Sequence, residues 1–370
     1  MITRKIRVLL VDDSVVVRRL LTQMLSADSA IEVVGAASNG KIALIKIPLV
    51  KPDVVVLDVE MSEMNGLETL AAIRSTDKRL PVIMFSTLTM RGASATLDAL
   101  ALGANDYVTK PSGPGESNSI SRTHQELLDK IKIHGGGAAA FAAPAPAAAA
   151  TPIPLRPAPV RHRPAEVIAI GISTGGPNAL AELMPCFPAD LAVPILIVQH
   201  MPPVFTKLLA ERLDAKARIS IQEARPGEVV RPGTAWLARG DYHMTVERVG
   251  GEIYLRTSQA APENSCRPAA DVLFRSVAAA YGPASLAAVM TGMGQDGLRG
   301  CEEIRGLGGQ IVVQDEASSV VWGMPGFVAR AGLADCVAPL AEIGTEIMRR
   351  VRKRQDMAPT NKLQASGFKS

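Results

Sequence analysis

Aromatic residues are scarce in this chain of 370 residues: Phe, Tyr and Trp make up 4% of it, whereas hydrophobic residues together make up 47%. Cysteine is also scarce, and Cys186, Cys266, Cys301 and Cys336 are widely spaced without a Cys-x-x-Cys pair. This spacing argues against a disulfide framework and against a zinc site. We therefore expect aliphatic cores in a protein of a reducing compartment.

The sequence also lacks a large excess of one charge and a long apolar run. Lys and Arg number 40 against 36 Asp and Glu, and the two signs are interspersed, whereas a nucleic-acid-binding face needs a clustered basic excess. No apolar stretch approaches the roughly 18 residues of a membrane-spanning helix, and residues 1–5 do not begin a signal peptide. The sequence predicts a cytoplasmic protein without membrane insertion or nucleic-acid binding.

Two stretches of alternating strand-like and helical patterns flank a segment rich in Ala, Pro and Gly. Prolines recur between residues 144 and 164, and they forbid a continuous helix there. We expect a first domain over residues 1–134, a linker over 135–164, a second domain over 165–356 and a flexible tail over 357–370.

The alternation of strands and helices predicts an α/β protein with two doubly wound parallel sheets. The first is expected to be flavodoxin-like and the second Rossmann-like. Between Ile219 and Thr257 the pattern is interrupted by two β-rich stretches and a hairpin with its turn at Gly250 and Gly251. These stretches predict an antiparallel excursion on one edge of the second sheet.

In the first half, polar side chains follow the predicted strands. Asp12 and Asp13 end the first strand, Asp58 the third and Ser86 the fourth, while Lys110 follows the fifth. Taken singly, an aspartate here could be a helix cap and the lysine a turn residue. Three carboxylates at one sheet edge, however, need a cation among them, and Mg²⁺ fits such a set. We expect an aspartate that accepts a phosphoryl group, stabilised by metal, lysine and hydroxyl.

This arrangement resembles the receiver domains of two-component systems over about residues 4 to 125. The resemblance implies that a partner histidine kinase phosphorylates Asp58. It also implies that Mg²⁺ is held by Asp13, Asp58 and the carbonyl of Glu60, with Asp12 supporting the water shell of the metal. No cofactor is expected in the second domain.

By the same resemblance, Ser86 and Lys110 contact the phosphoryl group, and Tyr107 occupies the position of the aromatic rotamer switch. One departure is Ser62, where receiver domains often carry a proline. We expect this departure to loosen the loop but to remove no ligand.

In the second half, three residues with acyl-transfer chemistry follow three predicted strands: Ser173, His200 and Asp296. The turn at Ser173 matches Gly-x-Ser-x-Gly, although such a turn could also hold a phosphate, and Asp296 could simply cap a helix. Strand ends of a parallel sheet converge on one crevice. We therefore expect Ser173 as nucleophile, His200 as base and Asp296 as its orienting carboxylate, with the N–H groups of Thr174 and Met293 at the oxyanion site.

Several motifs of both halves resemble the CheB family of chemotaxis response-regulator protein-glutamate methylesterases, over about residues 4 to 350. They include Gly171–Pro177, Gln199–Pro203, Arg239–Met244 and Thr291–Gly297. The resemblance implies hydrolysis of glutamate γ-methyl esters, and deamidation of selected glutamines, on chemoreceptors. It also implies that the unphosphorylated receiver shields the esterase face and that phosphorylation of Asp58 weakens this docking.

Two positions depart from that family: Gln295 stands where asparagine is common, and Cys266 where a histidine often precedes Arg-Pro. His243, at the start of an edge strand, is expected to be structural. The residues alone predict a phosphate-regulated serine hydrolase, and the methyl-glutamate substrate comes from the resemblance. Two alternatives stay open: the same chemistry on a different receptor array, and a response-regulator scaffold whose hydrolase site is idle.

Overall fold

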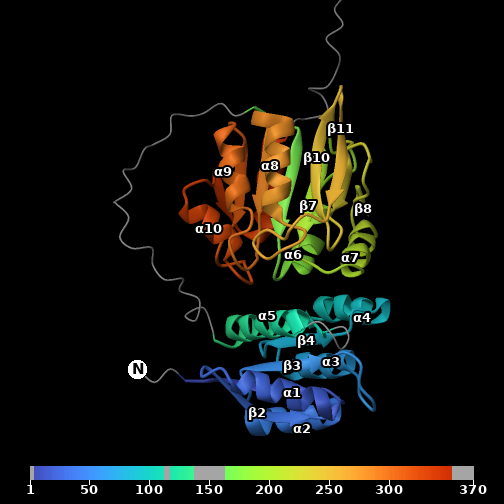
Figure 1. Ribbon diagram of the computed structural model, residues 1–370, viewed down its shortest axis with the longest axis vertical. Helices are drawn as coiled ribbons and strands as arrows, with labels where there is room; N and C mark the ends of the chain where they lie inside the picture. The colour runs from blue at the N-terminus through green and yellow to red at the C-terminus, as the bar shows by residue number, and fades with distance from the viewer. Residues whose placement is uncertain (1–3, 112–116, 137–162, 352–370) are drawn as a thin grey trace, which may run out of the picture.

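The computed structural model describes residues 4–111, 117–136 and 163–351. The expected tail over 357–370 and most of the expected linker over 135–164 lie outside these residues. The described residues form two units, each a parallel sheet with flanking helices, stacked along the long axis of the molecule (Figure 1). The fold class expected from the sequence is confirmed.

The first unit contains five parallel strands and five helices. The strands are β1 (Ile6–Val11), β2 (Ile31–Ala37), β3 (Val54–Asp58), β4 (Val82–Ser86) and β5 (Asp106–Thr109). The helices are α1 (Val15–Ser26), α2 (Gly40–Val50), α3 (Gly66–Thr76), α4 (Met90–Ala101) and α5 (Ser117–Gly135). The strand order β2-β1-β3-β4-β5 is the flavodoxin-like order.

Side-chain caps fix the turns that follow β1 and β3. Helix α1 begins after Ser14, whose hydroxyl accepts a hydrogen bond from the Val17 N–H. Asn65 and Glu68 form a capping box at the start of α3. These turns carry the acidic residues at the carboxyl edge of the sheet.

The second unit contains a sheet of seven parallel strands. They are β6 (Val167–Ile172), β7 (Ile195–Gln199), β8 (Ser220–Glu223), β9 (Thr234–Leu237), β12 (Ser285–Val289), β13 (Gln310–Gln314) and β14 (Cys336–Ala338), in the order β14-β13-β12-β6-β7-β9-β8. The helices are α6 (Gly176–Leu183), α7 (Phe205–Asp214), α8 (Ala270–Tyr281), α9 (Leu298–Gly306), α10 (Met324–Arg330) and α11 (Leu340–Arg350).

The expected hairpin is confirmed as β10 (His243–Val249) and β11 (Glu252–Ser258), which pair antiparallel in a separate two-stranded sheet. The expectation that the two preceding β-rich stretches share an antiparallel excursion is wrong, because β8 and β9 pair in parallel with each other and β9 with β7. Between β8 and β9 the chain runs back along β11, where the N–H groups of Gly227 and Val230 donate to the carbonyls of Leu255 and Ile253. Because of this return, β9 starts at the same edge of the sheet as β8 and runs parallel to it.

The winding of the second sheet reverses at β6. From β6 the chain passes to β7, β8 and β9 on one side, and later crosses to β12, β13 and β14 on the other. The carboxyl ends of β6 and β12 therefore flank a topological switch point, which is where open α/β sheets bind ligands.

The cores are largely aliphatic, and the largest fully buried side chains are Phe187, Phe205 and Phe274. One apolar cluster continues from Tyr107 and its neighbours in the first unit to Phe205 and its neighbours in the second. Among the helices of the described ranges, none has the length and apolar character needed to cross a membrane.

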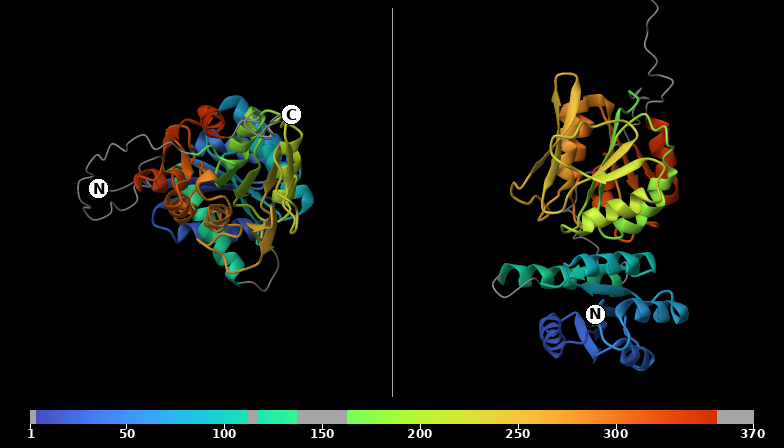
Figure 2. Two further views of the ribbon diagram at one scale, coloured as in Figure 1. Left: turned by 90° about the horizontal axis from the view of Figure 1, so that it is seen from above. Right: turned by 90° about the vertical axis from the view of Figure 1, so that its right-hand side faces the viewer.

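Helix α4 of the first unit packs against α6 and α7 of the second (Figures 1 and 2). Arg212 of α7 forms an ion pair of 2.8 Å with Asp98 and donates a hydrogen bond of 2.9 Å to the carbonyl of Ser94. Asn178 of α6 donates to the carbonyl of Leu100 at 3.0 Å. Because α6 and α7 follow β6 and β7, this contact lies beside the carboxyl edge of the second sheet.

Candidate active site and phosphoacceptor site

Ser173 and His200 lie side by side because their strands are paired in register. Ile172 of β6 is opposite Gln199 of β7, and the next residue of each strand is the serine and the histidine. The His200 N–H donates to the Ile172 carbonyl at 3.2 Å, so the pairing extends to the strand ends. The two side chains therefore start from neighbouring positions at one sheet edge.

The loop after β12 packs directly against the serine turn. The Ser173 N–H donates to the Thr291 carbonyl at 2.9 Å, and the Thr291 hydroxyl donates to the Thr174 carbonyl at 2.9 Å. A Cβ atom at Gly292 would lie 2.8 Å from the Cβ of Ser173, so no side chain fits at position 292. This close approach brings the loop that carries Asp296 to the switch point.

Asp296 is held to His200 and to the start of α8. Its Oδ2 accepts from His200 Nε2 at 2.7 Å and from the Ala270 N–H at 2.6 Å. Its Oδ1 accepts from the N–H groups of Asp271 and Gly297, each at 3.0 Å. Burial alone would raise the pKa of this carboxyl, but the bonds from His200 and the backbone lower it. The carboxylate is ionised and oriented toward the imidazole.

Asp296 does cap a helix, which was one of the two roles considered for it. The helix is α8, however, and not α9, which follows Asp296 in the sequence. The residue before α9 is Gly297, with a φ of 92° and no side-chain cap, whereas Asp296 accepts from the first N–H groups of α8. A carboxylate is favourable at a helix N-terminus. The same contacts fix the carboxylate that accepts the hydrogen bond from His200.

Asn264 is a contact of this site that the sequence patterns do not reveal. Its Nδ2 donates to Asp296 Oδ1 at 3.0 Å and to Asp271 Oδ2 at 2.9 Å. The residue has a φ of 51°, a conformation that asparagine tolerates better than most residues. The amide thus bridges two buried carboxylates. A turn with left-handed asparagine is the only sequence signal that could have pointed to it.

The second ring nitrogen of His200 faces Cys266. Its Nδ1 lies 3.5 Å from Cys266 Sγ, and within the described residues the Ser173 hydroxyl has no hydrogen-bond partner. Burial disfavours the imidazolium, but the sulfur of Cys266 and the carboxylate of Asp296 outweigh it and raise the pKa of His200 to about 10. His200 is therefore hydrogen-bonded to Asp296 and in contact with Cys266. Ser173 lies beside it, and its hydroxyl makes no hydrogen bond with any part of the chain that the structure describes.

Thr174 and Met293 present backbone N–H groups beside Ser173. Across the ranges that the structure describes, neither N–H donates a hydrogen bond. Thr174 is buried, whereas the side chain of Met293 is 37% exposed. Free donors on the two turns next to a nucleophile are the feature that an oxyanion site requires.

His243 is not at this site. It is fully buried, its Nε2 lies 3.1 Å from the Ala261 carbonyl, and its Nδ1 accepts from the Ala269 N–H at 3.3 Å. Both nitrogens are engaged by backbone groups. This matches the structural role expected from the sequence, in a more buried position than an edge strand suggests.

The first unit gathers its acidic residues at the carboxyl edge of its sheet. Carboxylate oxygens of Asp12, Asp13 and Asp58 lie within 4.8 Å of one another. Lys110 Nζ lies 2.9 Å from Asp12 Oδ2 and 2.8 Å from Asp58 Oδ2. One ammonium cannot neutralise three carboxylates, so the donor set fits a hard divalent cation such as Mg²⁺.

Asp58 is buried at the centre of this cluster. Burial is the largest influence, and it raises the pKa of the carboxyl to about 6 despite the opposing effect of Lys110. The Glu60 N–H donates to Asp58 Oδ1 at 3.3 Å, so the loop after β3 folds back onto the carboxylate. Ser86 is buried at the end of the neighbouring strand, and its hydroxyl donates to the Gly92 carbonyl at 3.1 Å.

Tyr107 lies on β5 and is 7% exposed. Its ring stacks on Phe205, the first residue of α7, with centroids 4.9 Å apart and planes 11° from parallel. The expected switch aromatic therefore sits in the contact between the two units.

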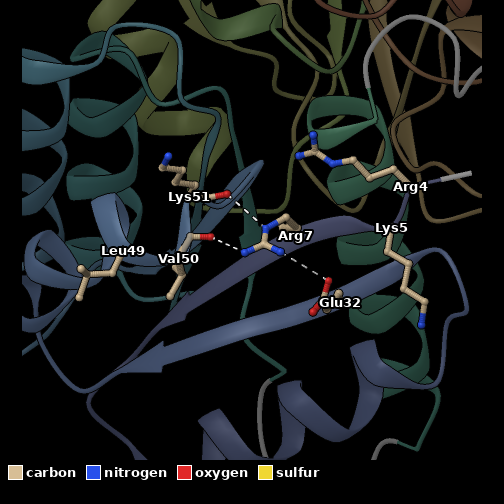
Figure 3. A pocket seen from close by; sticks show the side chains of 7 residues that line it. All are labelled: Arg4, Lys5, Arg7, Glu32, Leu49, Val50 and Lys51. Carbon is tan, nitrogen blue, oxygen red and sulfur yellow. Dashed lines mark hydrogen bonds and ion pairs between the residues drawn. The ribbon is translucent and has the colours of Figure 1, made fainter.

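A surface hollow lies elsewhere, beside the amino end of β1 (Figure 3). Arg7 donates there to the carbonyls of Val50 and Lys51 and pairs with Glu32 at 3.8 Å. Arg4 pairs with Asp53. The hollow is at the opposite edge of the sheet from Asp58, and its arginines already have partners, so it belongs to neither site.

Comparisons with known proteins cover both units. Residues 168–347 match the model of the CheB methylesterase family, and residues 8–120 match that of the response regulator receiver domain. A protein of Trichodesmium erythraeum named protein-glutamate methylesterase/protein-glutamine glutaminase is 53% identical over 94% of this chain and 99% of its own length. A protein of the same name from Nocardioides sp. is 50% identical over 97% of this chain and 99% of its own.

Among solved structures, the catalytic domain of Thermotoga maritima CheB methylesterase aligns with a TM-score of 0.50 and 37% identity, covering 50% of this chain and 99% of that one. The aligned share corresponds to the second unit, and the family models account for both. The chain therefore belongs to the CheB methylesterase family, with a receiver domain preceding the methylesterase domain.

Proposed function

We propose that the chain is a phosphorylation-regulated serine hydrolase that demethylates glutamate γ-methyl esters, and deamidates glutamines, on the cytoplasmic part of chemoreceptors. The observation that carries the proposal is the His200–Asp296 hydrogen bond of 2.7 Å beside Ser173 at the switch point. The named activity of the two relatives supports the substrate class.

In the proposed reaction, the Ser173 hydroxyl attacks the ester carbonyl while His200 Nδ1 takes its proton. Nδ1 is the available base because Nε2 carries the proton that Asp296 accepts. His200 then gives the proton to the leaving methoxide, and methanol departs from an acyl-serine. Water attacks the acyl group by the same route and releases the glutamate. For a glutamine substrate the leaving group is ammonia.

The tetrahedral intermediate carries a negative oxygen, and the N–H groups of Thr174 and Met293 are proposed to bind it. Loss of one such donor typically costs about 2.7–4 kcal/mol of transition-state stabilisation. The support is that neither N–H has another partner within the described ranges. These steps draw on side chains and backbone groups of this chain alone.

In the receiver domain, Asp58 is proposed to accept a phosphoryl group from a partner histidine kinase. Asp13, Asp58 and the Glu60 carbonyl would hold Mg²⁺, and Asp12 would support its water shell. Bound there, the cation would offset the negative charge of the phosphoryl oxygens. The support is the cluster of three carboxylates around one lysine.

Lys110 and Ser86 are proposed to contact the phosphoryl oxygens. Lys110 already bridges two of the carboxylates. Ser86 would have to release the Gly92 carbonyl in α4 to reach the phosphoryl group. Because α4 packs on α6 and α7, the loss of this hydrogen bond to α4 would alter the contact between the two domains.

The receiver is proposed to restrain the esterase until Asp58 is phosphorylated. The contact between the domains lies on the helices that follow the strands of Ser173 and His200. Tyr107 stacks within this contact, so a movement of its ring would disturb the docking. A tethered domain can cover a neighbouring site without a tight intrinsic affinity.

Methanol release from methylated receptor membranes tests the proposed activity. Ser173→Ala is expected to abolish release while leaving folding and phosphorylation of Asp58 intact. Ser220→Ala, on the exposed edge strand β8, is the matched control and is expected to behave like the wild type. Substantial release by a folded Ser173→Ala variant would contradict the nucleophile assignment.

A further inference from the structure

The basic nitrogen of His200 is engaged by a sulfur atom. Because Asp296 is an acceptor and binds Nε2, the proton of a neutral imidazole resides on Nε2 and Nδ1 carries the lone pair. Cys266 Sγ lies 3.5 Å from that Nδ1. Ser173 must use the same nitrogen, and its hydroxyl makes no bond within the described ranges.

The position of Cys266 is fixed by a tight turn. The Cys266 N–H donates to the Glu263 carbonyl at 2.8 Å, and the Glu263 N–H donates back at 3.1 Å. Asn264 and Ser265 between them have φ values of 51° and 62°. Glu263 is anchored by Arg275 through two hydrogen bonds of 2.7 and 2.6 Å. The sulfur is therefore aimed at His200 by the backbone.

We propose that Cys266 is a positioning residue of the esterase: in the resting enzyme its sulfur pairs with His200 Nδ1 and keeps this nitrogen from Ser173. The base becomes available when the pair opens. The proposal rests on His200 being the base of the proposed function.

The proton of the pair moves between two atoms. Either the thiol S–H donates to a neutral Nδ1, or the proton has passed to Nδ1 and the imidazolium donates to a thiolate. No other atom is exchanged in this step. In both states Nδ1 cannot accept the proton of Ser173, so the pair lowers the fraction of enzyme that is ready for attack.

The charged groups around Cys266 and His200 favour the state in which a proton lies between the sulfur and Nδ1. The ionisable groups around it are Asp296, Asp271, Glu263, Arg275, Arg267, Asp241 and His243. Arg275 offsets Glu263, and Arg267 offsets Asp241 at 2.5 Å. Asp271 accepts hydrogen bonds from Asn264 and from the Gly300 N–H. Asp296 is the carboxylate that is bonded to the imidazole itself, and it stabilises the cationic ring.

Cys266→Ala and Cys266→Ser in the full-length chain test the effect on catalysis. Both are expected to move the rising limb of the pH profile of kcat/KM to lower pH. At pH 7 the rate would increase about tenfold for each pH unit of that movement. A merely structural cysteine would leave the limb in place, and unchanged limbs in both variants would overturn the proposal.

Alkylation of the thiols tests the pair without relying on esterase activity. Iodoacetamide labelling of the full-length protein, read by peptide mass spectrometry, compares Cys266 with the exposed Cys186. Because the Cys266 sulfur contacts His200 Nδ1, His200→Gln is expected to change the labelling rate of Cys266 and to leave the Cys186 rate unchanged. The same Cys266 rate with and without His200 would refute the pairing even if Ser173→Ala behaves as expected.

Discussion

Tyr107 of the receiver and Phe205 of the methylesterase domain stack with their rings nearly parallel, 4.9 Å apart. Phe205 opens α7, five residues after His200, and Tyr107 lies on the strand that precedes Lys110. A single ring pair thus connects the strand beside the proposed phosphoacceptor site with the segment that carries the proposed base, His200. Rotation of Tyr107 away from Phe205 would remove this contact.

Arg212→Ala is expected to raise methylesterase activity in the absence of phosphorylation, because it removes the bonds from α7 to Asp98 and Ser94. The ion pair with Asp98 contributes about 1 kcal/mol at most, and the hydrogen bond to Ser94 adds to it, so an increase of about fivefold or more is expected. Methanol release would be measured with and without a phosphodonor. Lys207→Ala is the control, because Lys207 pairs with Glu211 within the same helix, and equal effects of both variants would count against the docking role.

Asp58→Asn is expected to abolish phosphate uptake and the stimulation that depends on it. It should also stabilise the receiver at neutral pH. Because burial raises the pKa of Asp58 to about 6, the folded state holds this proton more tightly than the unfolded chain. Ionised Asp58 is therefore destabilising, fully so above about pH 6 and not at all below about pH 4.

The stability gain of Asp58→Asn should follow that window: about 3 kcal/mol above pH 6 and close to zero near pH 3.5. Denaturant unfolding of the full-length protein, followed through the receiver transition, measures it. A constant gain across the range would contradict the buried-carboxyl explanation.

Asn264→Gly is expected to lower kcat of the esterase. Glycine keeps the left-handed backbone at this position but removes the amide that bridges Asp271 and Asp296. Loss of a buried hydrogen bond to a charged group costs about 1–3 kcal/mol. We therefore expect kcat to fall about tenfold or more. Gln259→Ala removes an exposed side-chain bond to Asp241 and should leave kcat unchanged.

Much of the candidate site could be predicted because it depends on strand ends. Ser173, His200 and Asp296 each follow a continuous apolar run, and parallel strands deliver such residues to one edge whatever the details of packing. The same reasoning brought Asp12, Asp58 and Lys110 together, and their oxygens and nitrogen lie within ion-pair distance. Local pattern and topology suffice for placements of this kind.

Other features depend on side-chain directions and long-range returns of the chain, which patterns do not encode. The turn that aims Cys266 at His200 uses left-handed Asn264 and Ser265. Asparagine tolerates that conformation, but the sequence pattern does not show that this turn lies against His200. The parallel direction of β8 and β9 depends on a connection that runs along β11. The stacking of Tyr107 on Phe205 requires the relative placement of two separately folded sheets.

The central position of β6 separates the origins of the two partners of Ser173. His200 arrives from the strand on one side and Asp296 from the strand on the other, with the β10–β11 hairpin inserted in the long excursion between them. Insertions and deletions in that excursion can accumulate without displacing the serine, since its own strand and turn precede them. Recombination between homologues should consequently tolerate crossovers at the hairpin tip, near Gly250, far better than crossovers within the glycine-rich loop from Thr291 to Gly297.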